Sequence, residues 1–282
     1  MTSILSVLTR TRCTEYGSYL SILGNGEHCW RTGLRKHTAK SANRFFYKTR
    51  LAFPADYGRV ITFMSDAYLK HDPVMMSAGL AEREPEPSLL RLMHDEVSEG
   101  MTIIAEGQDN CIVGAAVNAG CCPWDPDKFV EFARCCECGP TRDVIEFWAY
   151  VTRKPNLWQR RRVLKIFECS WLAIEPDHRG QGIGRKLVLE SWYLARDCGY
   201  RLFRIDCTSR HTAQIARGFG WERVCTIPLN RHVNRNGELL FKHIRQPHTE
   251  VEVYVDNVTF CKDYHLPYKK RKTTSVHKEE RS

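Results

Sequence analysis

Hydrophobic positions along the first half of the chain predict helices and one hairpin. Apolar residues recur at helical spacing from residue 57 to 69, which indicates a helix that ends just before a proline. A second helix with an apolar face is expected after Pro87. Residues 101–105 and 111–117 predict two antiparallel strands joined by a Gly-Gln-Asp-Asn turn, and residues 125–138 predict a further helix.

The second half of the chain alternates strands with helices. Residues 163–174 and 202–207 predict strands, and residues 183–198 predict an amphipathic helix between them. A short helix and two closing strands are expected at residues 212–217, 223–229 and 251–258. This alternation favours a single α/β domain, in which helices cover both faces of a mixed, mostly antiparallel sheet.

Composition and charge exclude several classes of protein. The chain has 282 residues, of which 43% are hydrophobic, and this is ample for one buried core. No apolar run approaches the roughly 20 residues that cross a bilayer, so we expect no contact with a membrane. Thirteen cysteines without a signal-peptide pattern indicate reduced thiols, so we expect a cytoplasmic protein. We also expect a monomer.

Both ends of the chain differ from its middle. Residues 1–50 are rich in Ser, Thr, Arg and Lys and lack a sustained period, so we expect a loosely ordered basic extension there. The folded domain is expected at residues 51–260, followed by a basic tail at residues 261–282. Met1–Arg12 would suit a mitochondrial transit helix and Lys269–Lys272 a nuclear address, which are the alternatives to a cytoplasmic location.

A glycine-rich turn follows the strand that is predicted at residues 163–174. Its sequence, Arg179-Gly180-Gln181-Gly182-Ile183-Gly184, opens the next helix. Backbone N–H groups at a helix N-terminus attract anions, and glycine lets a phosphate approach them closely. The turn lacks the Gly-Lys-Ser/Thr of a nucleotide P-loop and the Gly-x-Gly-x-x-Gly spacing of the dinucleotide fingerprint. It matches Arg/Gln-x-x-Gly-x-Gly/Ala through Arg179, Gly182 and Gly184.

This turn resembles the acetyl-CoA signature of the GNAT superfamily of N-acetyltransferases, and residues 172–176 look like the fourth strand of that family. The resemblance covers roughly residues 55–258 and is closest to the insect arylalkylamine (dopamine) N-acetyltransferases. It implies a sheet that is splayed open at the cofactor site and acetyl-CoA as co-substrate, whose phosphates suit the net charge of +9, with no metal. The residues implied to bind acetyl-CoA are Leu172, Ala173, Ile174, Arg179, Gly180, Gln181, Gly182, Ile183, Gly184 and Arg185.

Glu168 is a candidate catalytic base. An amine attacks a thioester only as the free base, so acetyl transfer needs a group that takes its proton. The resemblance places Glu168 where histone-acetylating relatives have their general base, and it places Glu168 and Ser170 where vertebrate arylalkylamine enzymes have two histidines. Apolar Phe167 and Cys169 flank Glu168, so burial is expected to raise its pKa, and strand alternation would put Glu168, Ser170 and Leu172 on one face. Solvent exposure is the alternative.

A second carboxylate competes for this role. Tyr68–Val74 resembles the Phe-Phe-Lys-Asp-Glu-Pro-Leu segment of the insect enzymes, in which the Glu before Pro is the base, and Asp72 stands there with a shorter side chain. Asp72 could instead only cap a turn before Pro73. The insect enzymes also have catalytic serines after their fifth strand, where this chain has Thr208 and Thr212. Either threonine could instead cap a helix.

The sequence says less about the molecule that accepts the acetyl group. Phe147–Tyr150 lies in the stretch that lines the acceptor pocket of arylalkylamine enzymes, although an apolar helix core fits it equally well. We expect acetyl transfer to the primary amine of a small arylalkylamine such as dopamine, tryptamine or serotonin. The alternatives are a polyamine or a protein amine as acceptor, or a catalytically weak CoA-binding protein, while nucleic acid is not an expected partner.

The clustered cysteines raise a zinc hypothesis, because four thiolates can close a tetrahedral site. They are Cys121-Cys122 and Cys135-Cys136-x-Cys138. Adjacent cysteines cannot easily both face one ion, and no Cys-x-x-Cys pair is present. We therefore expect free thiols and no metal at these positions.

Overall fold

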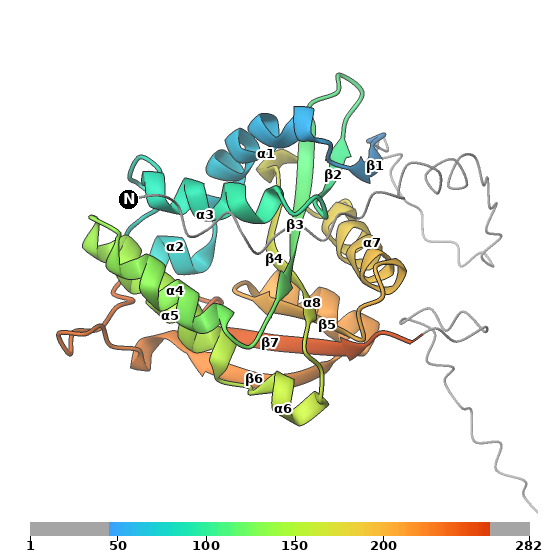
Figure 1. The fold of residues 1–282 in the computed structure, drawn as a ribbon. Helices are drawn as coiled ribbons and strands as arrows, with labels where there is room; N and C mark the ends of the chain where they lie inside the picture. Colours follow the sequence, from blue (N-terminus) through green and yellow to red (C-terminus); the bar gives the residue numbers. More distant parts are fainter. Residues whose placement is uncertain (1–44, 260–282) are drawn as a thin grey trace, which may run out of the picture. The chain divides into compact units, whose positions relative to one another are not determined.

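The structure is a computed structural model that describes residues 45–259. The expectations for Met1–Arg12 and Lys269–Lys272 lie outside the described residues. Within them, seven strands form one mixed sheet in the order β1-β2-β3-β4-β5-β7-β6, and helices cover both of its faces (Figure 1). Every neighbouring pair is antiparallel except β4 and β5, which are parallel. The predicted α/β class and mixed, mostly antiparallel sheet are confirmed.

The strand predictions hold for all strands but the first. The strands are β1 (Lys48–Leu51), β2 (Ile103–Glu106), β3 (Ile112–Cys121), β4 (Ile166–Ile174), β5 (Leu202–Cys207), β6 (Glu222–Pro228) and β7 (Glu250–Asn257). The sequence pattern does not predict β1, because its four residues, Lys-Thr-Arg-Leu, show no run of alternating apolar residues. Pairing with β2 holds β1 in the sheet.

Most helices lie near the predicted ranges, and three, at residues 73–77, 139–153 and 157–161, were not predicted. They are α1 (Tyr57–Met64), α2 (Pro73–Ser77), α3 (Pro87–Val97), α4 (Asp125–Arg134), α5 (Gly139–Arg153), α6 (Leu157–Arg161), α7 (Ile183–Asp197) and α8 (Arg210–Phe219). The helix predicted at residues 57–69 continues past α1 as a turn of π-helix, Ser65–Leu69. The helix predicted at residues 125–138 ends at Arg134, and α5 begins anew with a proline in its first turn, a preferred position.

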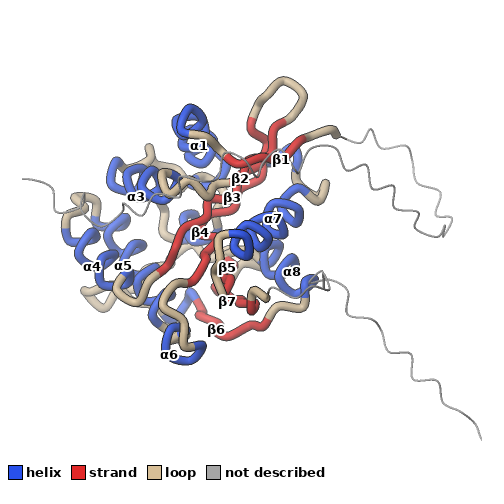
Figure 2. Tube along the Cα trace, turned by 45° about the vertical axis from the view of Figure 1, so that its right-hand side comes forward, coloured by secondary structure: helices blue, strands red, loops and turns tan. Residues whose placement is uncertain are grey.

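Two hydrophobic cores cover the two faces of the sheet. Helices α1, α3 and α5 pack on one face through buried side chains such as Val60, Met93 and Phe147. Helices α7 and α8 pack on the other face through residues such as Leu187 and Phe219. The tube view separates the two helical layers on either side of the sheet (Figure 2). Any residue of the central strand β4 therefore faces one of two different helical environments.

Strand β4 contains a β-bulge that changes which way its side chains face. In its pairing with β3, Trp171 lies opposite Val117 and Cys169 lies opposite Asn118, so Ser170 is an extra residue on β4. A one-residue change of register sends every later side chain to the other face of the sheet.

The bulge shows that the prediction of a shared face for Glu168, Ser170 and Leu172 is wrong. Leu172 packs into the core under α7, as Cys169 does before the bulge, whereas Trp171 packs into the core under α1 and α3. Simple alternation fails here because the bulge adds one residue to β4 without adding one to β3.

Candidate active site

The parallel strands β4 and β5 separate at the centre of the sheet. Their pairing runs from Phe167 to Cys169 on β4 and ends opposite Ile205 of β5. Strand β4 continues to Ile174 while bonded to β3 on its other edge. Leu172, Ala173 and Ile174, the predicted pantetheine-binding residues, lie on this continuation, where the edge that faces β5 has lost its strand partner. The splayed sheet expected from the sequence is present.

The glycine turn lies where β4 leads into α7. Gly180 and Gly182 have φ angles of 78° and 84°, the left-handed region in which glycine alone is unstrained. A Cβ at either position would meet no atom within 4 Å, so the backbone conformation and not crowding requires glycine. The side chain of Arg179 donates from Nε to the carbonyl of Ile174 at 3.1 Å, which ties the turn to the end of β4.

The first turn of α7 can hold an anion. Gly182 is the N-cap of the helix and contributes no side-chain hydrogen bond. The first N–H groups of a helix have no partner within it, so they can bind phosphate oxygens. Gln181 and Arg185 are exposed beside them, with the Arg185 guanidinium 4.7 Å from the centre of the Phe219 ring. Ile183, by contrast, is buried and anchors this turn in the core under α7.

Asp72 and Thr208, which the sequence suggested from two distant segments, are in direct contact. Thr208 donates from Oγ1 to Oδ2 of Asp72 at 2.5 Å. The other oxygen of Asp72 accepts the N–H groups of Val74 at 2.9 Å and Met75 at 3.2 Å, so Asp72 also caps α2. Burial raises the pKa of Asp72, while the hydrogen bonds from Thr208, the two amides and Tyr68 oppose the rise.

Thr212 does not join this pair. Ser209 is the N-cap of α8 and accepts the Thr212 N–H at 3.1 Å. The hydroxyls of Ser209 and Thr212 lie 2.9 Å apart, so the Thr212 hydroxyl has a partner inside its own helix start. A cavity of about 190 Å³ opens next to this junction and is lined by residues that include Cys207 and Ser209.

Glu168 is partly buried beside an arginine that the sequence pattern did not single out. The side chain of Arg204 is 0% exposed, and its Nε lies 3.5 Å from Glu168 Oε1. Arg204 also forms two hydrogen bonds to Asp206, at 2.9 and 2.6 Å, and donates to the carbonyls of Val151 and Thr152 at the end of α5. Burial raises the pKa of Glu168, as expected, and Arg204 opposes the rise. In the sequence, Arg204 and Asp206 alternate with apolar residues along β5, and this pattern could have indicated a buried ion pair.

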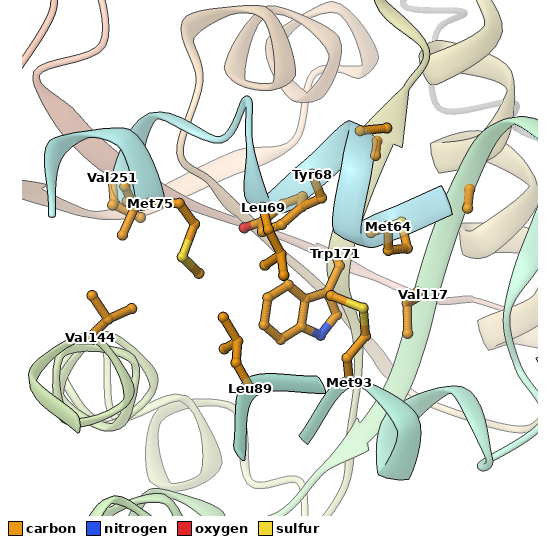
Figure 3. Packing of buried hydrophobic residues seen from close by; sticks show 14 of the residues in the cluster. Met64, Tyr68, Leu69, Met75, Leu89, Met93, Val117, Val144, Trp171 and Val251 are labelled. Carbon is orange, nitrogen blue, oxygen red and sulfur yellow. The ribbon is translucent and has the colours of Figure 1, made fainter. Parts of the chain in front are cut away.

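Glu96 on α3 is a second acidic residue that the sequence reading missed. Its Oε2 accepts the indole N–H of Trp171, the residue that follows the bulge in β4. Burial raises the pKa of Glu96 to about 8, with Glu168 adding to the rise and the Trp171 and Ser170 side chains opposing it. The rings of Trp171 and Tyr68 meet edge to face at 5.0 Å (Figure 3). Asp72 and Glu96 thus each contact one ring of this aromatic pair.

Two further expectations concern Phe147–Tyr150 and the cysteines. Phe147 is fully buried against His232 and Phe241, whereas Tyr150 lines a cavity of about 530 Å³ that excludes every predicted catalytic residue. No group of three or more His, Cys, Asp or Glu between residues 45 and 259 is arranged to hold a metal. The cysteines of that part of the chain are free thiols. Helices long and apolar enough to cross a bilayer are likewise absent from the described region.

Comparison with known proteins identifies the fold and a domain match within the chain. Residues 125–223 match the model of the acetyltransferase (GNAT) domain. A mosquito arylalkylamine N-acetyltransferase like 5b has a TM-score of 0.71 at 22% identity, over 75% of this chain and 100% of that one. Arylalkylamine N-acetyltransferase 2 from Aedes aegypti has a TM-score of 0.70 at 22% identity, over 76% and 99%. Drosophila melanogaster polyamine N-acetyltransferase, which forms N-acetylagmatine, has a TM-score of 0.68 at 23% identity, over 75% and 100%.

These structural likenesses establish the fold, and the domain match covers β4, the glycine turn and α7, the elements in which the sequence predicts the acetyl-CoA site. The separated strands and the β-bulge lie next to each other in the sheet, and β4 leads from them into the glycine turn at the start of α7. Residues 125–223 of the chain match the acetyltransferase (GNAT) domain, and the described region has the fold of the N-acetyltransferases to which it is compared.

Proposed function

We propose that this chain transfers the acetyl group of acetyl-CoA to the primary amine of a small arylalkylamine by direct attack. The observation that carries the proposal is the hydrogen bond between Thr208 and Asp72, which lies just beyond the end of β5, the strand that separates from β4. The aromatic pair of Tyr68 and Trp171 lies beside Asp72 and makes the surroundings of this hydrogen bond aromatic. Two arylalkylamine N-acetyltransferases with the same fold add support.

The α7 side of the sheet would bind the cofactor. The backbone amides of residues 180–184 would hold the pyrophosphate at the start of α7. The pantetheine arm would follow Leu172, Ala173 and Ile174 along the unpaired edge of β4. A backbone N–H of this segment would then polarise the thioester carbonyl where negative charge develops.

The proton steps follow from the hydrogen bond of Thr208. When the amine nitrogen bonds to the carbonyl carbon, it carries a proton that it must lose. The Thr208 hydroxyl would accept this proton and pass its own to Asp72 Oδ2, 2.5 Å away. The reverse transfer would protonate the CoA sulfur as the carbon–sulfur bond breaks. A thiol pKa of about 8.5 makes this leaving group undemanding.

Glu168 is the less favourable base in this geometry. Its carboxylate shares the buried guanidinium of Arg204 with Asp206, so protonating Glu168 would weaken the charge balance around Arg204. We assign Glu168 the role of holding Arg204, and through it the junction of β4 and β5. Ser170 we assign to the bulge beside the thioester, where its hydroxyl contributes to the surroundings of Glu96.

Charge favours one alternative acceptor, a polyamine or agmatine. The acceptor face carries the carboxyl groups of Asp72, Glu96, Glu168 and Asp206 around a single guanidinium, that of Arg204, among the residues at positions 45–259. Excess negative charge in a buried site is stabilised by a cationic ligand. The similar fold of a Drosophila enzyme that forms N-acetylagmatine agrees with this alternative.

A panel assay tests both acceptors. The purified full chain is incubated with acetyl-CoA and dopamine, tryptamine, serotonin, agmatine, spermidine or a lysine peptide, and free CoA is followed. We expect the highest kcat/KM with an arylalkylamine. Turnover confined to agmatine and spermidine would replace the arylalkylamine by the cationic acceptor. Binding of acetyl-CoA without turnover of any amine would contradict the enzymatic proposal and leave a CoA-binding protein.

A further inference from the structure

We propose that Glu96 receives the first proton of the acceptor, converting its ammonium group into the free amine before Asp72 and Thr208 handle the second proton. This inference rests on the proposed function. An alkylamine enters as an ammonium ion and leaves as an amide, so its nitrogen gives up two protons in each turnover. One of them ends on the CoA thiol, and the other must reach water. The Asp72–Thr208 pair accounts for only one of these transfers.

Glu96 reaches the reaction site through the β-bulge. Helix α3 packs on the acceptor face of the sheet, and its Leu89 and Met93 surround the Trp171 ring (Figure 3). From the last turn of α3, Glu96 accepts the Trp171 indole N–H, one residue from the extra residue Ser170. The carboxylate is therefore held beside the point where β4 parts from β5.

Glu96 differs from the other two carboxylates in what its oxygens bind. Glu168 is paired with the guanidinium of Arg204. Asp72 accepts two helix N–H groups and a hydroxyl. Glu96 accepts hydrogen bonds from neutral groups, and no Lys, Arg or His of residues 45–259 forms an ion pair with it. A carboxylate that lacks a cation is the natural partner of an arriving ammonium ion.

The surroundings of Glu96 suit both the binding and the proton transfer. The titratable groups that face it are Glu99 just after the end of α3, Glu168 on β4 and Tyr68 from the segment before α2, and none of them is cationic. The N–H bond of the ammonium breaks and an O–H bond forms on Glu96. Because Glu96 is only partly buried, it then releases this proton to water.

The pKa of Glu96 suits the proposed role of a general base. Burial and Glu168 raise the pKa of Glu96 to about 8, near the pH at which the enzyme would work. A general base is most effective when its pKa lies close to the operating pH. In the wild type, kcat/KM for an ammonium substrate should rise with pH until Glu96 is ionised and then level off near pH 8.

The test compares Glu96→Gln with Asp95→Asn, a change at the adjacent exposed position of the same helix. We expect Glu96→Gln to lower kcat/KM about 100-fold at pH 7 and to remove the break near pH 8, so that the rate climbs toward the pKa of the amine itself. A fluorinated amine that is already neutral at pH 7 should be acetylated by Glu96→Gln almost as fast as by the wild type. Glu96→Asp keeps a carboxylate and should retain a break.

The outcomes separate the two proposals. Thermal melting of each variant shows whether it is folded. An active wild type whose break persists unchanged in folded Glu96→Gln overturns the role of Glu96 and leaves the proposed function standing. An equal loss with neutral and charged amines also overturns it, because a purely structural role does not depend on the ionisation of the substrate. A wild type that acetylates no amine overturns both proposals.

Discussion

The two sides of β4 are built from different parts of the protein. On the α7 side, the proposed acetyl-CoA site consists of backbone: an unpaired strand edge, two glycines with positive φ, and the start of a helix, all within residues 172–185. On the acceptor side, the proposed site consists of side chains, Asp72, Glu96, Glu168 and Thr208, from four segments. Thr208 and Asp72 are 136 residues apart in the chain.

Because of this difference, we expect the two sides of β4 to tolerate different amino-acid substitutions. A site made of backbone depends on conformation, so exchanging an exposed side chain there changes little. A site made of buried charged side chains depends on every partner, because removing one leaves another uncompensated. We therefore expect the largest losses from substitutions on the acceptor side.

Arg204→Met should have the largest effect on stability. It leaves the carboxylates of Glu168 and Asp206 buried without their cation, which costs about 3–5 kcal/mol in the free energy of unfolding. Urea unfolding measures this, with Arg201→Met at an exposed position just before β5 as the control. A loss no larger than that of the control would mean that Arg204 does not balance the two carboxylates.

Asp72→Asn should have the next largest effect, this time on turnover. The amide keeps an oxygen to cap α2 but cannot accept the proton that Thr208 passes on, so kcat should fall about 10²- to 10³-fold with little change in acetyl-CoA affinity. Steady-state kinetics and calorimetry check the two parts, and Asp66→Asn, at an exposed position before α2, is the control. If Glu168→Gln lowers kcat more than Asp72→Asn does, the base is Glu168.

Gly182→Ala tests the side that is made of backbone. At a φ of 84° an alanine is strained by about 1–2 kcal/mol, so the turn should relax away from its present conformation and KM for acetyl-CoA should rise roughly tenfold. Gln181→Ala removes an exposed side chain from the same turn and should leave KM nearly unchanged. Equal effects of the two substitutions would contradict a site made of backbone.

Thr212→Ala should have the smallest effect. The Thr212 hydroxyl is bonded to Ser209 at the start of α8, so its loss should cost about 0.5–1 kcal/mol of stability and leave kcat intact. Thr208→Ala should lower kcat, because it interrupts the path to Asp72. Assaying both variants side by side distinguishes them. A similar fall in kcat for both would bring Thr212 into the catalytic machinery.

The local sequence pattern was sufficient to predict most helices and strands. It failed for features that depend on the pairing of one strand with another. The strand predicted at residues 202–207 coincides with β5, and α7 follows its predicted range to within one residue, because each carries a periodic apolar pattern between clear stops. Strand β1 escaped prediction because it lacks such a pattern and exists through its bonds to β2. The bulge at Ser170 escaped for a similar reason, since a bulge is defined by the register of two strands.

The sequence by itself determined the glycine turn from Arg179 to Gly184 and the strand and helix on either side of it, because φ angles and helix starts depend on neighbouring residues. Only the tertiary structure decided that Thr208 forms a hydrogen bond to Asp72, that Arg204 pairs with Glu168, and that Glu96 lies beside the bulge. Contacts between side chains from distant segments depend on the packing of helices on a sheet, and no local pattern encodes them.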